Sequence, residues 1–155
     1  MDPKQAASTA KAHFESGCNC AQAVFLTFAQ QYGLTPQTAL ALSSSFGGGM
    51  GRLREVCGAV SGMLMAAGLQ FGGYDPTDHA AKQAHYSRVQ TLAKQFEEKN
   101  GSIICRELLG LTERRDAPTP EARTPAYYAK RPCGELVASA AEIFAQYLNE
   151  QRPQQ

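Results

Sequence analysis

Residues that start and stop helices recur along the sequence, and no stretch alternates apolar and polar residues as a half-buried strand does. Asn19 precedes the apolar run CAQAVFLTFAQQY, Thr35-Pro36 opens PQTALALSSSF, and Asn100-Gly101 closes a long polar segment. Asn and Thr favour the helix N-cap, Pro favours the first turn, and Gly favours the position after the last turn. These signals predict an all-α protein.

Seven helices are predicted from the spacing of the apolar residues, over 3–16, 20–32, 36–46, 54–69, 76–99, 103–108 and 133–150. The segment 112–132 contains four prolines and is expected to form a loop or an extended arm. A chain of 155 residues is long enough to bury a proper core. We therefore expect one all-α domain over residues 1–155, built as a bundle of five to seven helices.

Charge and hydropathy exclude several classes of protein. The 15 basic and 14 acidic residues leave a formal net charge of +1, without a run of Lys and Arg, so nucleic-acid binding is not expected. The most apolar window, 56–71, is interrupted by glycines and falls short of the roughly 20 residues that a membrane span requires. The first residues lack the apolar centre of a signal peptide, so a cytoplasmic protein is expected.

The five cysteines are the residues with the most chemical content. Their odd number, in a chain expected to lie in a reducing compartment, argues against a disulfide framework. Four of them, called the site cysteines below, fall at or near the first turn of four different predicted helices: Cys20, Cys57, Cys105 and Cys133. A helix N-terminus offers free N–H groups and a partial charge of roughly +0.5. It thereby favours the thiolate, which is the form that ligates metals and attacks disulfides.

Residues 47–51, called the glycine loop below, lie shortly before Cys57 and hold four glycines. No Lys-Ser or Lys-Thr follows, so the loop is not a phosphate-binding P-loop. Its free N–H groups are suited to an anion-binding nest beside the cysteines. The residues expected to contact a cofactor through such groups are Gly48, Gly49, Gly51 and Gly58. Gly58 also forms, with Gly62 and Ala66, a small-residue stripe that predicts close helix packing.

These motifs resemble the redox-active family named C_GCAxxG_C_C for its spaced cysteines around Cys-Gly-Ala-x-x-Gly. The segments GCNCAQAVFLTF, FGGGMGR, CGAVSG and GSIICRELLG carry the resemblance, which extends over residues 14–144. The family's four characteristic cysteines correspond to the site cysteines, whereas Cys18 stands where the family commonly has an aromatic residue. The resemblance implies a redox role, and a related domain in a multihaem cytochrome holds an iron–sulfur cluster. The C-x-x-C-H haem attachment motif is absent from this sequence.

Three functions remain open at this level. The first is a small electron-transfer or redox-sensing protein whose site cysteines hold an iron–sulfur cluster, most simply [2Fe–2S], and which serves an unidentified redox partner. The second is a thiol–disulfide oxidoreductase that uses the same cysteines without metal. The third is a helical module that binds zinc or a partner, with a homodimer through the arm left open. Arg52, Arg54 and Arg106 each neighbour a site cysteine, and surface charge is their simplest role.

Overall fold

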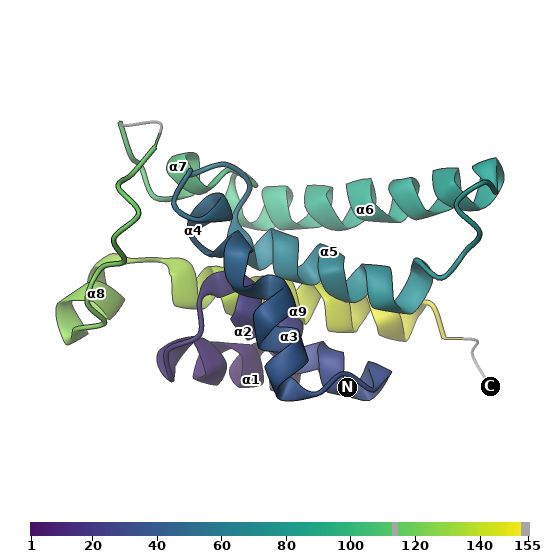
Figure 1. Ribbon diagram of the computed structural model, residues 1–155, viewed down its shortest axis with the longest axis horizontal. Helices are drawn as coiled ribbons and strands as arrows, with labels where there is room; N and C mark the ends of the chain where they lie inside the picture. The colour runs from purple at the N-terminus through teal and green to yellow at the C-terminus, as the bar shows by residue number, and fades with distance from the viewer. Residues whose placement is uncertain (113–114, 153–155) are drawn as a thin grey trace.

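The computed structural model describes residues 1–112 and 115–152, which are helical without strands (Figure 1). Its eight helices are α1 (Pro3–Glu15), α2 (Cys20–Ala29), α3 (Pro36–Ser43), α5 (Gly58–Phe71), α6 (His79–Asn100), α7 (Cys105–Leu108), α8 (Pro125–Lys130) and α9 (Cys133–Glu150). The segment labelled α4 (Gly47–Met50) is one turn of the glycine loop, interrupted where Gly48 and Gly49 take positive φ. The all-α prediction is confirmed, and the predicted count of five to seven helices is slightly too low for the described residues.

Two helices begin later than their sequence predicts. The helix expected from Arg54 begins at Gly58, because Arg54 has a φ of 59° and Val56 forms an isolated antiparallel bridge with Ile104. The longest helix begins at His79 rather than beside Pro76, because the Asp78 carboxylate is the group that accepts from the N–H of Ala81. By contrast, the capping box predicted at the start of α2 is confirmed in both directions.

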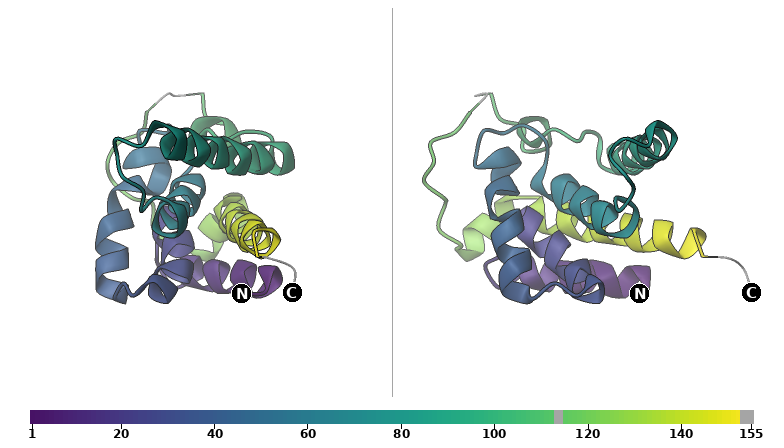
Figure 2. Two further views of the ribbon diagram at one scale, coloured as in Figure 1. Left: turned by 90° about the vertical axis from the view of Figure 1, so that its right-hand side faces the viewer. Right: turned by 45° about the vertical axis from the view of Figure 1, so that its right-hand side comes forward.

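The core lies where α1, α2, α5 and α9 pack on one another. α6 and α1 lie on opposite sides of α5 and α9, as the two turned views also show (Figure 2). Phe28 of α2 and Phe144 of α9 meet edge to face, with 4.9 Å between their ring centroids. Leu92 and Phe96 attach α6 through its buried face. Because α6 buries few other side chains, it covers the core instead of forming it.

Two glycines allow α2 and α5 to approach closely, as the small-residue stripe predicts. A Cβ atom at Gly62 would lie 2.6 Å from the backbone oxygen of Ala21, and one at Gly58 would lie 3.2 Å from the Cβ of Cys20. Real Cβ atoms essentially never lie at the first distance and rarely at the second, so a side chain at either position would push against the neighbouring helix. The start of α2 is thereby held against the start of α5.

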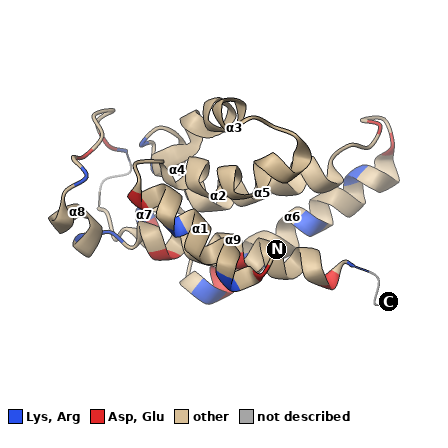
Figure 3. Cartoon of the chain, turned by 90° about the horizontal axis from the view of Figure 1, so that it is seen from below, with Lys and Arg blue, Asp and Glu red and all other residues tan. Residues whose placement is uncertain are grey.

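The charged residues lie mainly on α1, α6, α9 and the arm, while α2, α3 and α5 carry none (Figure 3). In the described part of the arm the backbone is irregular as far as Thr124, after which α8 occupies part of the segment expected to be a loop. Glu113 and Arg114 of the arm, and residues 153–155 at the C-terminus, lie outside the described residues. Within those residues, no helix is both long and apolar enough to cross a membrane.

Candidate functional site

A cavity of about 240 Å³ lies at the end of the bundle where α5, α7 and α9 begin, beside the glycine loop (Figure 1). Its wall contains all four site cysteines, each from a different helix start. Gly48, Gly51 and Gly58 line the same cavity, as does α8 through Tyr127. The structure thus brings together four thiols that are separated by up to 113 residues (20 to 133) in the sequence.

Hydrogen bonds at the start of α2 fix the position of Cys20. Asn19 caps the helix by accepting from the N–H of Gln22 at 2.9 Å, and Gln22 returns the contact by accepting from the N–H of Asn19 at 3.0 Å. The Asn19 amide also donates to the carbonyl of Ser44 at 3.0 Å, just before the glycine loop. Cys20, the first residue of α2, therefore lines the cavity from a helix start that is hydrogen-bonded to Ser44, another lining residue.

Cys57 and Cys105 are held by one short pair of extended segments. The N–H of Cys57 donates to the carbonyl of Ile103 at 2.7 Å, and the N–H of Cys105 donates to the carbonyl of Glu55 at 2.6 Å. Cys57 then serves as the N-cap of α5, while Cys105 is the first residue of α7. Both side chains are almost fully buried, at 4% and 6% exposed. The bridge between residues 56 and 104 therefore sets the spacing of these two thiols.

The glycine loop requires a glycine at position 49, which packs against Cys105. Gly49 has a φ of 67°, and a Cβ atom there would lie 2.6 Å from the Cβ of Cys105. Gly49 is buried beneath the cavity wall, whereas Gly48 and Gly51 face the cavity. The positive φ continues through Met50, Arg52 and Arg54, three residues that rarely adopt it. Such strained backbone persists only where surrounding contacts impose it, and it often marks functional sites.

The thiols differ in how readily they ionise, contrary to the expectation that every helix start favours a thiolate. The pKa of Cys20 is lowered to about 6 by hydrogen bonding to the Cys133 thiol, against the effect of burial and with help from the N–H groups of Gly48 and Cys20. The same hydrogen bond and burial raise the pKa of Cys133. Burial is also the main cause of the raised pKa of Cys57 and of Cys105. Helix starts alone do not offset desolvation here.

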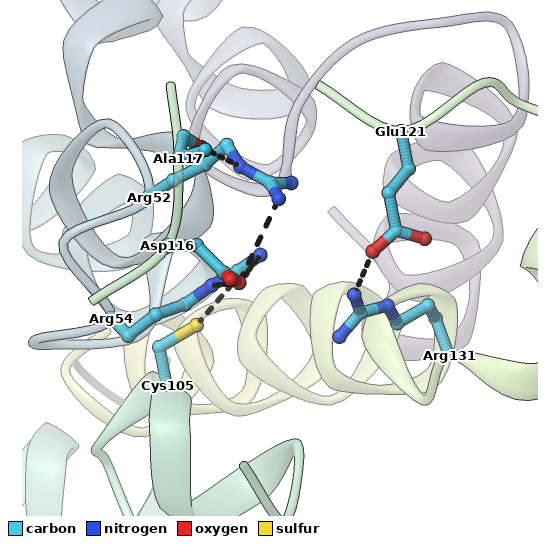
Figure 4. Close-up of polar contacts among 7 residues, drawn as sticks. All are labelled: Arg52, Arg54, Cys105, Asp116, Ala117, Glu121 and Arg131. Carbon is cyan, nitrogen blue, oxygen red and sulfur yellow. Dashed lines mark hydrogen bonds and ion pairs between the residues drawn. The ribbon is translucent and has the colours of Figure 1, made fainter. Parts of the chain in front are cut away.

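Arg54 corrects the surface role expected from sequence, because it is only 4% exposed. Its Nη1 donates to the sulfur of Cys105 at 3.6 Å, and its Nε donates to Asp116 Oδ2 at 2.9 Å (Figure 4). Burial acts to lower the pKa of Arg54, but the Cys105 and Asp116 contacts outweigh it and the pKa is raised. Arg106 keeps a partly exposed ion pair, at 3.1 Å from Glu55.

Sequence reasoning missed three charged arm residues that line the cavity, Glu121, Arg123 and Arg131. Arg123 donates to the carbonyls of Phe14 and Cys18, both at 3.2 Å, and stacks over the Phe14 ring at 4.4 Å. Arg131 forms an ion pair with Glu121 across the cavity mouth. The only hint in the sequence is that these charges lie in a proline-rich segment, which carries no information on what the segment covers.

The described thiols are all free, including Cys18, whose pKa is raised by burial. Among the described residues, no three His, Cys, Asp or Glu side chains are placed to hold a single metal ion. The site cysteines line one cavity without forming such a group among the described side chains. Their thiol chemistry suits either a group that spans several ångströms or exchange between neighbouring sulfurs.

Comparison with known proteins gives one match. The family described as "Putative redox-active protein (C_GCAxxG_C_C)" matches residues 18–147. This range contains all four site cysteines, the glycine loop, the described part of the arm and most of α9. No curated protein and no solved structure matches the chain.

Proposed function

Because the chain belongs to the redox-active C_GCAxxG_C_C family, we propose that it is a small redox protein whose four site cysteines bind an iron–sulfur cluster, most simply [2Fe–2S]. The observation that carries the proposal is the cavity wall, in which thiols from four helix starts face one space. When bound, such a cluster supplies one-electron redox chemistry to a partner or as a sensor.

The donor set fits a binuclear cluster better than a single ion. Each iron of a [2Fe–2S] centre takes two protein ligands, whereas a structural zinc gathers four ligands at about 2.3 Å around one point. Cys20 and Cys133 both line the cavity and each shifts the pKa of the other, so we take them as one pair of ligands. Cys57 and Cys105 flank the bridge between residues 56 and 104 and form the other. The described side chains do not supply the compact group that zinc needs.

The residues around the cysteines are suited to negative charge. Four thiolates and a [2Fe–2S]²⁺ core carry a net charge of about −2, and each helix start offsets roughly half a unit. The N–H of Gly48 stabilises the Cys20 thiolate, and the buried guanidinium of Arg54 donates to the Cys105 sulfur. Donors to sulfur raise the reduction potential and hold the ligands in orientation.

Anaerobic reconstitution with iron and sulfide tests the proposal. The wild-type chain should gain brown colour and about two irons and two acid-labile sulfides per protein. Cys18→Ser is the matched control, because Cys18 is a half-buried thiol that does not line the cavity. It should load normally, whereas Ser at any site cysteine should reduce loading. A chain that stays colourless and iron-free after anaerobic reconstitution refutes the cluster.

A second candidate, thiol–disulfide exchange, is favoured by the unlike pKa values of Cys20 and Cys133. The Cys20 thiolate would attack a partner disulfide and release one thiolate, which takes up a proton. Cys133 would then give up its proton and attack Cys20, leaving the chain as a disulfide and the partner as a dithiol. In this case Cys133→Ser should trap a mixed disulfide through Cys20 under a disulfide substrate. A metal-free chain that exchanges no disulfide excludes this route.

A further inference from the structure

Arg54 lies between the cysteine site and the arm, and it makes charged contacts with both. Its guanidinium donates to Cys105 through Nη1 and to Asp116 Oδ2 through Nε, while Nη2 lies 2.9 Å from the same oxygen. The two acceptors come from α7 and from the arm (Figure 4). A charge that is only 4% exposed depends on such partners, because their loss leaves it desolvated and unpaired.

The Arg54 backbone is also fixed, so the side chain has little freedom to follow either partner. Its N–H donates to the carbonyl of Gly48 at 3.3 Å, and its carbonyl accepts from Arg106 Nη1 at 3.1 Å. Its φ is 59°, and its side chain is part of the cavity wall. Loss of one acceptor should therefore weaken the hydrogen bond between the guanidinium and the other acceptor.

The arm is hydrogen-bonded to the segment that follows the glycine loop, mainly through Asp116 and Ala117. The N–H of Asp116 donates to the carbonyl of Arg52 at 3.0 Å, and Arg52 Nε donates to the carbonyl of Ala117 at 2.7 Å. Pro118 and Pro120 follow and line the cavity mouth. Arg52 thus shares the arm contact with Arg54, but it has no hydrogen bond to a site cysteine among those described.

We propose that Arg54 is a positioning residue that couples Cys105 to the arm. While the Cys105 sulfur is available as an acceptor, Arg54 holds Asp116 and keeps the arm over the cysteine cavity. When that acceptor is lost, the buried guanidinium loses part of its hold and the arm loosens. The coupling belongs to the protein without metal, and so it stands apart from whether a cluster binds.

Hydrogen–deuterium exchange of the segment 115–124 in the reduced, metal-free full chain tests the coupling. Cys105→Ala should raise exchange in this segment about three- to tenfold, the effect of losing one hydrogen bond of ordinary strength. In an Arg54→Gln background the same change should have no further effect. In an Arg52→Gln background it should keep its full effect, because Arg52 contacts the arm without Cys105. An unchanged arm in Cys105→Ala, or an equal effect in both backgrounds, overturns the proposal.

Hydrogen–deuterium exchange in α1 and α9 reports whether a variant is folded. If Cys105→Ala does not fold, a second variant tests the coupling. Asp116→Asn changes a partly exposed arm residue and should leave the core intact. It removes the charged partner of Arg54, so a reciprocal coupling should weaken the Arg54 contact with Cys105 as well. Arg52→Gln removes another arm contact, including a 3.7 Å ion pair with Asp116, but leaves the Arg54–Asp116 pair in place. Hydrogen–deuterium exchange of the α7 segment 105–109 should therefore be about threefold faster in Asp116→Asn than in Arg52→Gln. Equal rates in the two variants contradict the coupling. Arg54→Lys, which keeps the charge without the fork, should restore only part of the wild-type arm protection.

Discussion

The contact between α2 and α5 gives a prediction that depends on geometry alone. In Gly62→Ala the new methyl group would lie 2.6 Å from the Ala21 carbonyl oxygen and 3.1 Å from the Val24 Cβ. The nearest atom belongs to the helix backbone, so it cannot move aside as the end of a flexible side chain can. Overpacking of this kind costs about 1–3 kcal/mol.

The helix preference of alanine acts in the opposite direction. Replacing Gly by Ala inside a helix gains about 1 kcal/mol, so Gly62→Ala should lose up to about 2 kcal/mol net. Gly68→Ala is the matched control in the same helix, because nothing lies within 4 Å of its added methyl group. It should gain about 0.5–1 kcal/mol. For a chain of this length, the loss at Gly62 lowers the midpoint of thermal unfolding by up to about 8 °C.

Urea unfolding of the two variants measures the difference directly. Gly62→Ala should unfold at lower urea than wild type, and Gly68→Ala at the same or higher urea, with unchanged m-values. If Gly62→Ala proves as stable as Gly68→Ala, the two helices are not in the close contact described. The argument that this contact holds Cys20 beside Cys57 would then be wrong as well.

Three further predictions concern the site. In the reduced, metal-free chain, the alkylation rate of Cys20 should rise with pH around a midpoint near its pKa of about 6, because the reactive thiolate forms as the pH increases. Peptide mass spectrometry over a pH series measures this midpoint. A midpoint at the ordinary thiol value of about 8.5 contradicts the prediction. Gly49→Ala should reduce the free energy of unfolding by about 1–3 kcal/mol, because its methyl group meets the Cβ of Cys105 and its φ is positive; an unchanged urea midpoint refutes the account of the loop. In the iron–sulfur-loaded protein, Arg54→Gln should lower the reduction potential by roughly 60 mV, the one-electron equivalent of about 1.4 kcal/mol; voltammetry that finds no shift shows that the Arg54 donor does not act on the cluster.

Local sequence signals predicted the parts of the fold that local interactions decide. Asn19 and Gln22 form the capping box of α2 with each other, three residues apart, so the sequence alone is enough to place Cys20 at a helix start. The small-residue spacing of Gly58 and Gly62 likewise indicates a close contact without naming the partner helix. The sequence alone was therefore enough to predict that four cysteines lie at or near helix starts.

Long-range contacts decide what the sequence did not predict. The start of α5 moves to Gly58 because residues 55–57 pair with residues 103–105, which lie far along the chain. Arg54 is buried because it meets Asp116, 62 residues away in a segment without helical signals. The raised pKa of Cys57 follows mainly from burial, which is a property of the assembled core and not of a helix start.

X-ray absorption at the iron edge of the anaerobically reconstituted chain tests the central claim most directly. The claim is that four thiols from four helix starts surround one binuclear cluster. It predicts that every iron has a shell of sulfur atoms only, with one iron neighbour, and that Cys18→Ser gives the same spectrum as wild type. A shell containing nitrogen or oxygen, or iron without an iron neighbour, contradicts it.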